Sequence, residues 1–160
     1  MNKLVKLFGE LNWVRVGEPE IGYKATPNEP DKYQWKANLS LTKESLMEFM
    51  DLQATYGLKN KLSKKEDGTG YAVNFNRPTE RVNKKTGKVV KKYTNPTVTV
   101  DGKPFDGMIG NGSEGYVVLE MEEFKLMGDR KGYAARLHSI EVTKLIPYGS
   151  ENTEQKGFDQ

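Results

Sequence analysis

Residues 116–146 read YVVLEMEEFKLMGDRKGYAARLHSIEVTKLI, two long runs of residues on either side of a turn. The turn, Gly128-Asp129-Arg130-Lys131-Gly132, has the glycines and charged residues that favour a hairpin connection. We therefore predict two antiparallel strands, Tyr116 to Met127 and Tyr133 to Ile146. Strands of this length can curl around a small barrel.

The second of these strands contains an irregularity in its apolar pattern. Leu137 and Ile140 are three positions apart, so they cannot lie on the same face of a regular strand, in which side chains alternate. We predict a β-bulge near His138 and Ser139, which would let both apolar side chains enter the core.

An earlier segment, Tyr33 to Leu41, also alternates. Trp35, Ala37 and Leu39 are separated by polar residues, which predicts a strand with one core face and one solvent face. Trp35 is accordingly expected to pack in the core.

A first strand, broken in the middle, is expected between Val5 and Val16. The next stretch, Gly17 to Asp31, contains three prolines and two glycines and is predicted to be a long loop.

One helix is predicted, beginning near Thr42. Leu46, Phe49, Met50 and Gln53 recur there at helical spacing, and the Thr42 hydroxyl suits a helix start.

The middle of the chain predicts another hairpin. A strand from Gly70 to Arg77 is followed by turn residues between Asn83 and Gly87. We expect a return strand from Tyr93 to Val100, in which Pro96 implies an edge or a bulge.

These elements favour a mainly β protein, a small closed or partly closed barrel of five or six strands with one helix and long loops. A helix packed on a sheet, in an α+β arrangement, is the alternative. The 160 residues suit one domain. We assign it to residues 1–148 and expect residues 149–160 to form a flexible, weakly acidic tail.

The stretch from Gly70 to Ser113 carries the functional signal. Tyr71, Phe75 and Arg77 share one face of the predicted strand, and seven cations stand between Arg77 and Lys92 against the single carboxylate of Glu80. The whole chain has a net charge of only +3, so the basicity is concentrated here. Cations that track phosphates beside aromatic rings that accept bases are typical of single-stranded nucleic-acid binding.

The residues predicted to contact DNA come from this stretch and from two other strands. Tyr93 is the aromatic side chain favoured for stacking, whereas Tyr71 and Phe75 could equally point into the barrel. Arg136 is predicted to contact a phosphate of the DNA. The alternative is a surface ion pair of Arg136 with Glu120 or Glu122. The full set is Lys36, Asn38, Tyr71, Phe75, Arg77, Arg81, Lys84, Lys85, Lys88, Lys91, Lys92, Tyr93 and Arg136.

The sequence offers little for catalysis. It has no cysteine and one histidine, so thiolate metal sites are excluded and a nucleophilic triad finds no support. The segment from Gly107 to Gly115 lacks the Gly-Lys-Ser/Thr of a phosphate loop and is expected to be a turn. Glu120 and Glu122 are expected to balance charge on a solvent-facing side of their strand. We predict no enzymatic activity, no metal and no cofactor.

Carboxylates that could in principle hold two magnesium ions in a nuclease are Asp101, Asp106, Glu114, Glu120, Glu122 and Glu123. No apolar run of membrane-span or signal-peptide length occurs near the start of the chain, and no membrane partner is expected.

Four segments in a set order resemble a known family. They are residues 35–41 leading to a helix, the strand ending Phe75-Asn76-Arg77, residues 98–103, and Ile109-Gly110-Asn111-Gly112-Ser113 before two final strands. Together they resemble the single-stranded DNA-binding proteins of tailed bacteriophages. The resemblance implies an OB-fold barrel and a protein that coats and protects single-stranded DNA during phage replication, recombination and repair.

The resemblance also implies a location in the cytoplasm of the infected bacterial host and an acidic C-terminal tail that contacts replication or recombination proteins. The tail residues for this role are Glu151, Glu154, Phe158 and Asp159. Here the tail is only weakly acidic, so a plain flexible terminus is the alternative. For the whole chain, the alternative is a β-barrel protein-interaction or virion accessory module that binds no nucleic acid. The oligomeric state is left open.

Overall fold

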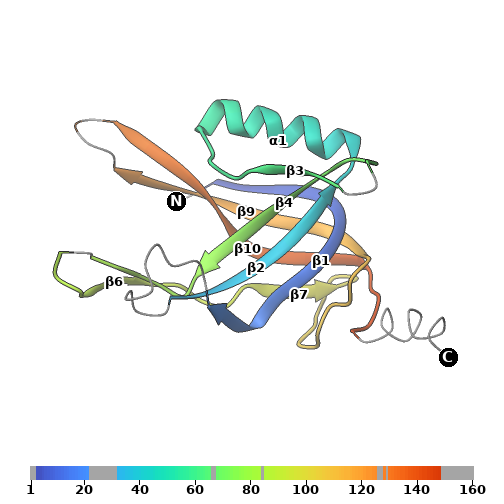
Figure 1. Ribbon diagram of the computed structural model, residues 1–160. Coiled ribbons are helices and arrows are strands. Elements are labelled where there is room, and N and C mark those ends of the chain that lie inside the picture. Colours follow the sequence, from blue (N-terminus) through green and yellow to red (C-terminus); the bar gives the residue numbers. More distant parts are fainter. Residues whose placement is uncertain are drawn as a thin grey trace.

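The computed structural model describes residues 3–21, 32–65, 68–83, 85–125, 128 and 130–148. The described chain is mainly β-structure with one helix (Figure 1). Its elements are β1 (Lys3–Ile21), β2 (Tyr33–Leu41), α1 (Lys43–Tyr56), β3 (Leu62–Lys64), β4 (Tyr71–Pro78), β5 (Glu80–Val82), β6 (Val89–Lys92), β7 (Thr97–Val100), β8 (Lys103–Pro104), β9 (Ser113–Lys125) and β10 (Lys131–Lys144).

The main sheet closes into a barrel. Its strands follow the order β3-β4-β2-β1-β9-β10-β7-β8, and a parallel contact of Arg136 with Asn76 joins β10 to β4. The strands β1, β2, β4, β10 and β9 thereby form a closed five-stranded barrel. This confirms the predicted OB-fold-like barrel and excludes the α+β alternative.

The β9–β10 hairpin that the sequence predicts is present, with its bulge. The two strands pair from Lys131–Lys125 to Lys144–Glu114, and the register shifts between Leu137 and Ser139. Because of this shift, Leu137 and Ile140 are both fully buried.

Helix α1 lies over one end of the barrel (Figure 1), where it contacts β1, β2 and β10. The Thr42 hydroxyl accepts a hydrogen bond from the Ser45 amide, so Thr42 is the N-cap. The Phe49 ring packs edge-on against the Phe75 ring, with centroids 5.6 Å apart. Met50, which shares the predicted apolar spacing, is 53% exposed, whereas Ser45 is buried and donates to the Phe8 carbonyl.

Two expectations about chain path are wrong. Strand β1 continues past Val16 to Ile21, so the predicted loop is shorter, and residues 22–31 lie outside the described part. The predicted return strand from Tyr93 to Val100 is also divided. β6 ends at Lys92 and pairs with β5, whereas β7 begins only at Thr97 and runs parallel to β10. Pro96, which has no N–H for a sheet, lies in the break.

Two glycines allow strands to approach closely where β1 passes between β2 and β9. Gly9 of β1 lies opposite Gly115 of β9. A Cβ atom on Gly9 would lie 2.2 Å from the Ser40 carbonyl oxygen, and one on Gly115 would lie 2.3 Å from the Glu141 carbonyl oxygen. Any side chain at either position would push backbone against backbone.

A buried carboxylate connects the segment after β6 to the barrel. Glu122 of β9 is 4% exposed, contrary to the expected solvent-facing position. It accepts hydrogen bonds from the Tyr93 hydroxyl at 2.8 Å, from Lys91 Nζ at 2.5 Å and from Arg136 Nε at 3.1 Å. We call these four residues the Glu122 cluster.

Burial alone would raise the pKa of Glu122, but the hydrogen bonds from Lys91, Tyr93 and Arg136 outweigh it and hold this pKa below its usual value. Burial, and next the hydrogen bond to Glu122, raises the pKa of Tyr93, so its hydroxyl remains a donor. A carboxyl group with a lowered pKa in the folded state stabilises the protein above its unfolded-state pKa. That contribution is lost as the pH falls through the folded-state pKa.

We expect Glu122→Gln to lower the free energy of unfolding at neutral pH by about 1–3 kcal/mol, because charged hydrogen bonds are replaced by neutral ones. The difference from the wild type should shrink as the pH falls below about 4.3, the ordinary pKa of a glutamate, because the unfolded chain then binds a proton there, and it should be lost as the pH falls through the lower folded-state pKa. Urea unfolding at neutral and acidic pH measures both values. Glu123→Gln, at an exposed neighbouring position, is the control. A deficit that stays constant down to acidic pH would contradict a charge-based role.

The close approach at Gly9 gives a second prediction. Gly9→Ala should destabilise the fold by about 1–3 kcal/mol or more, because the added Cβ meets the Ser40 backbone. Gly17→Ala is a matched control in the same strand, since nothing lies within 4 Å of a Cβ built there. Thermal unfolding of the two variants tests this, and equal melting temperatures would contradict it.

Candidate nucleic-acid interface

The solvent side of β1, β2 and β4 forms a continuous polar surface, because side chains alternate along each strand. In one cross-strand row, Asn12 pairs with Asn38, which pairs with Asn74. In the next row, Arg15 pairs with Lys36, which pairs with Asn76. We call this surface the outer face, and its six residues are Asn12, Arg15, Lys36, Asn38, Asn74 and Asn76.

The core side of the same strands is fully apolar at these rows. Leu11, Ala37, Leu39, Val73 and Phe75 are all buried, with exposures of 0–1%. The inward set holds the barrel together, so the outward set is not needed for packing.

The outer face carries amides and cations. The Asn38 amide donates to the Asn74 side-chain oxygen at 3.0 Å, and Arg15 is exposed at the next row. Amide groups both donate and accept hydrogen bonds, so they can contact base edges of any identity, and the cations can contact phosphates. The neighbouring carboxylate, Glu10, bonds to the Asn12 amide at the border of the face.

The basic hairpin β5–β6 adjoins the outer face. It follows β4 after Thr79, whose amide donates to the Tyr33 carbonyl at the start of β2. In Figure 1 the hairpin projects away from the barrel near the end of β4. Its exposed cations are Arg81, Lys85, Lys88 and Lys92. Lys84, also predicted to bind DNA, lies outside the described residues.

Three residues predicted to contact DNA are buried, and these predictions are wrong. Phe75 is fully buried against Phe49 in the core. Tyr93, favoured as the stacking ring, is 7% exposed and bonds to Glu122. Arg77 is 8% exposed because its guanidinium lies 5.1 Å from the Tyr93 ring and donates to the Thr94 carbonyl.

The remaining residues predicted to contact DNA lie in different surroundings. Arg136 and Lys91 both bind the Glu122 carboxylate, so the alternative of an ion pair holds for Arg136. Tyr71, at the first position of β4, is 39% exposed. Lys36 and Asn38 lie on the outer face as expected, and Trp35 is buried in the core as expected. The tail residues Glu151, Glu154, Phe158 and Asp159 lie outside the described part.

The structure adds residues that the sequence analysis missed. Asn74 and Asn76 alternate with Val73 and Phe75, which the structure shows to be buried, so both asparagines lie on the solvent side of the strand. The sequence pattern alone left the buried face of this strand open. Asn12 and Arg15 are separated by a shift in register between β1 and β2, which regular alternation could not reveal.

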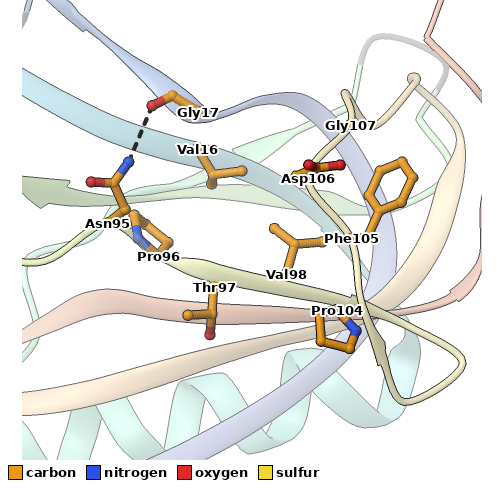
Figure 2. Close-up of a pocket in the computed structure, with 10 residues that line it drawn as sticks. All are labelled: Val16, Gly17, Asn95, Pro96, Thr97, Val98, Pro104, Phe105, Asp106 and Gly107. Carbon is orange, nitrogen blue, oxygen red and sulfur yellow. Dashed lines mark hydrogen bonds between the residues drawn. The ribbon is translucent and has the colours of Figure 1, made fainter.

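An open cavity of about 500 Å³ lies between the last part of β1 and the β7–β8 hairpin. Figure 2 shows Val16 and Gly17 on one side and Phe105 and Asp106 on the other, with the Asn95 amide donating to the Gly17 carbonyl. Its lining includes one carboxylate and no lysine or arginine. The cavity therefore does not extend the cationic surface toward phosphates.

Among the described residues, no group of three or more histidine, cysteine or acidic side chains could hold a metal ion. The acidic residues considered for magnesium do not form such a group there. No helix in the described ranges is long and apolar enough to cross a membrane.

No protein-family description matches the sequence, and no curated protein matches it either. Solved structures do match. The chain is similar to gp2.5, a single-stranded DNA binding protein encoded by bacteriophage T7, with a TM-score of 0.60 and 16% identity over 93% of this chain and 90% of that one.

It is also similar to the single-stranded DNA-binding protein from bacteriophage Enc34 in complex with single-stranded DNA, with a TM-score of 0.56 and 13% identity over 91% of this chain and 89% of that one. A further structure of the Enc34 protein gives a TM-score of 0.55 and 13% identity over 98% of this chain and 90% of that one. The likeness covers more than nine tenths of this chain, which therefore shares the fold of these phage single-stranded DNA-binding proteins, and in this chain that fold is an OB-fold-like barrel with one helix.

Proposed function

We propose that this protein binds single-stranded DNA along the outer face and the β5–β6 hairpin, with little sequence preference. The observation that carries the proposal is the position of the outer face. It lies on neighbouring strands of an OB-fold barrel, the region that such folds use for oligonucleotides. It combines cations and amides and continues toward an exposed basic hairpin.

The chemistry of the surface favours a single strand. Arg15, Lys36 and the cations of the hairpin supply electrostatic attraction that depends on phosphates and not on sequence. The asparagine amides of the outer face can bond to the Watson–Crick edges of bases only in a single strand, because base pairing occupies those edges in a duplex. Affinity would come mainly from charge, and preference for single strands from contact with the bases.

The role that fits these properties is coating and protection of single-stranded DNA in phage replication, recombination and repair, in the cytoplasm of the infected host. The similarity to phage proteins supports this role. We propose binding without catalysis and without a cofactor. Replication or recombination proteins would be recruited by the tail residues Glu151, Glu154, Phe158 and Asp159.

One observation favours a second candidate function. The β5–β6 hairpin exposes three apolar side chains, Val82, Val89 and Val90, by 41–54%. Exposed apolar groups on a hairpin suit a protein-interaction or virion accessory module, in which DNA binding would be absent. The two functions differ in their response to salt.

Binding of labelled oligo-dT, measured by anisotropy at several salt concentrations, tests the proposal against an equal-length duplex. We expect strand-selective binding that weakens with salt, with a log–log slope of roughly −0.7 for each phosphate neutralised. Lys36→Ala should weaken binding and reduce the steepness of the slope by about 0.7 if Lys36 contacts one phosphate.

A second variant, Lys88→Ala, should have the same effect from the hairpin. Lys43→Ala is the matched control, because Lys43 is an exposed cation at the start of α1, away from the outer face. Binding that is absent, or equal for duplex and single strand, would reject the proposal and favour the protein-interaction module.

A further inference from the structure

Trp13 is the most exposed aromatic side chain among the described residues, at 66%. It also has a backbone φ of 51°, in the left-handed region that a bulky residue rarely occupies. A tryptophan side chain that stays in water contributes little hydrophobic stabilisation to the fold, and a left-handed backbone conformation costs energy. Both features therefore count against a role in stability.

The position of Trp13 follows from a β-bulge in β1. Asn12 pairs with Asn38 and Arg15 pairs with Lys36, so Trp13 and Val14 together stand opposite the single residue Ala37. Val14 packs against the core. Trp13 is the extra residue, its backbone lies between the two rows of the outer face, and its side chain is exposed to solvent.

Side chains and backbone of the neighbouring turn hold this bulge in place. The Trp13 amide donates to the Asn111 side-chain oxygen at 2.8 Å. The Gly112 amide donates to both the Leu11 carbonyl and the Asn12 side-chain oxygen, each at 3.1 Å. The left-handed conformation of Trp13 is thus imposed by contacts from outside its own strand, as expected for strain retained at a functional position.

A comparison within the chain shows that this strain is unusual. The other described non-glycine residue with positive φ is Asp101. Asp101 and Gly102 form the two-residue turn between β7 and β8, where aspartate before glycine is a favoured choice. Trp13 lies inside a strand and has no turn to explain it.

We infer that Trp13 is a stacking platform on which an unpaired base of the bound strand rests. The inference rests on the proposed function and identifies a contact within that site. An indole held by its backbone, with its ring in solvent, can stack on a base without first being freed from other contacts. Arg15 and Lys36 in the adjacent row would hold the phosphates beside that base.

The two tryptophans make this contact directly observable. Trp35 is 4% exposed in the core, whereas Trp13 is exposed, so they differ in access to a ligand. We expect oligo-dT to quench the tryptophan fluorescence of the wild-type protein. The quenching should be lost in Trp13→Phe, in which only the buried Trp35 remains.

Trp13→Gly separates stacking from folding, because glycine readily adopts positive φ. We expect its melting temperature to stay unchanged or rise, while its affinity for oligo-dT, measured by anisotropy, falls by about 5- to 100-fold. Trp13→Phe should keep part of the affinity. Met47→Ala is the matched control, since Met47 on α1 is 67% exposed and lies away from the outer face.

The outcomes distinguish the inference from the proposed function. Wild-type protein that binds oligo-dT, with full affinity kept by Trp13→Gly, would overturn the inference and leave the function standing. A Trp13→Gly protein that unfolds would also overturn it, by assigning the ring to stability. Wild-type protein that does not bind oligo-dT at all would reject the function and, with it, the inference.

Discussion

One strand, β1, has to form two sides of the barrel at once. Its first part pairs with β9 from Lys3 to Leu11, and it pairs with β2 from Gly9 to Ile21. Over residues 9–11 it has a neighbour on both edges. A flat strand could not serve both partners, so β1 bends, with a glycine where the backbones are closest and a bulge beyond it. The closure of the barrel, and the position of the outer face, depend on this bend.

Much of the fold could be predicted from the sequence, because alternation reports which strands have a buried side. Alternation predicted the β9–β10 hairpin with its bulge and the strand β2, and helical spacing predicted the helix after Thr42. The course of the chain between Tyr93 and Val100 was not predicted, because the parallel pairing of β7 with β10 joins segments about forty residues apart. No local pattern records such a pairing.

The candidate site was harder to predict for a physical reason. Alternation divides a strand into two faces but does not say which face is buried when the face with the aromatic side chains also carries a charge. In β4 the aromatic and basic residues Phe75 and Arg77 point inward, and the plain asparagines point to solvent. Arg77 and Tyr93 are tolerated inside because they have partners there. Trp13 was missed because a bulge cannot be seen where the apolar pattern continues on either side of it.

The β5–β6 hairpin is joined to the barrel at its base, and this allows the length of the hairpin to change during evolution. The hairpin forms its own small sheet, and its tip from Asn83 to Lys88 makes local contacts among the described residues. Its base is held by the Thr79 backbone and by the Glu122 cluster. Insertions or deletions at the tip would therefore leave the barrel core untouched. The length of the hairpin could therefore change without a cost in folding, with the barrel as a constant frame and the hairpin as an adjustable extension.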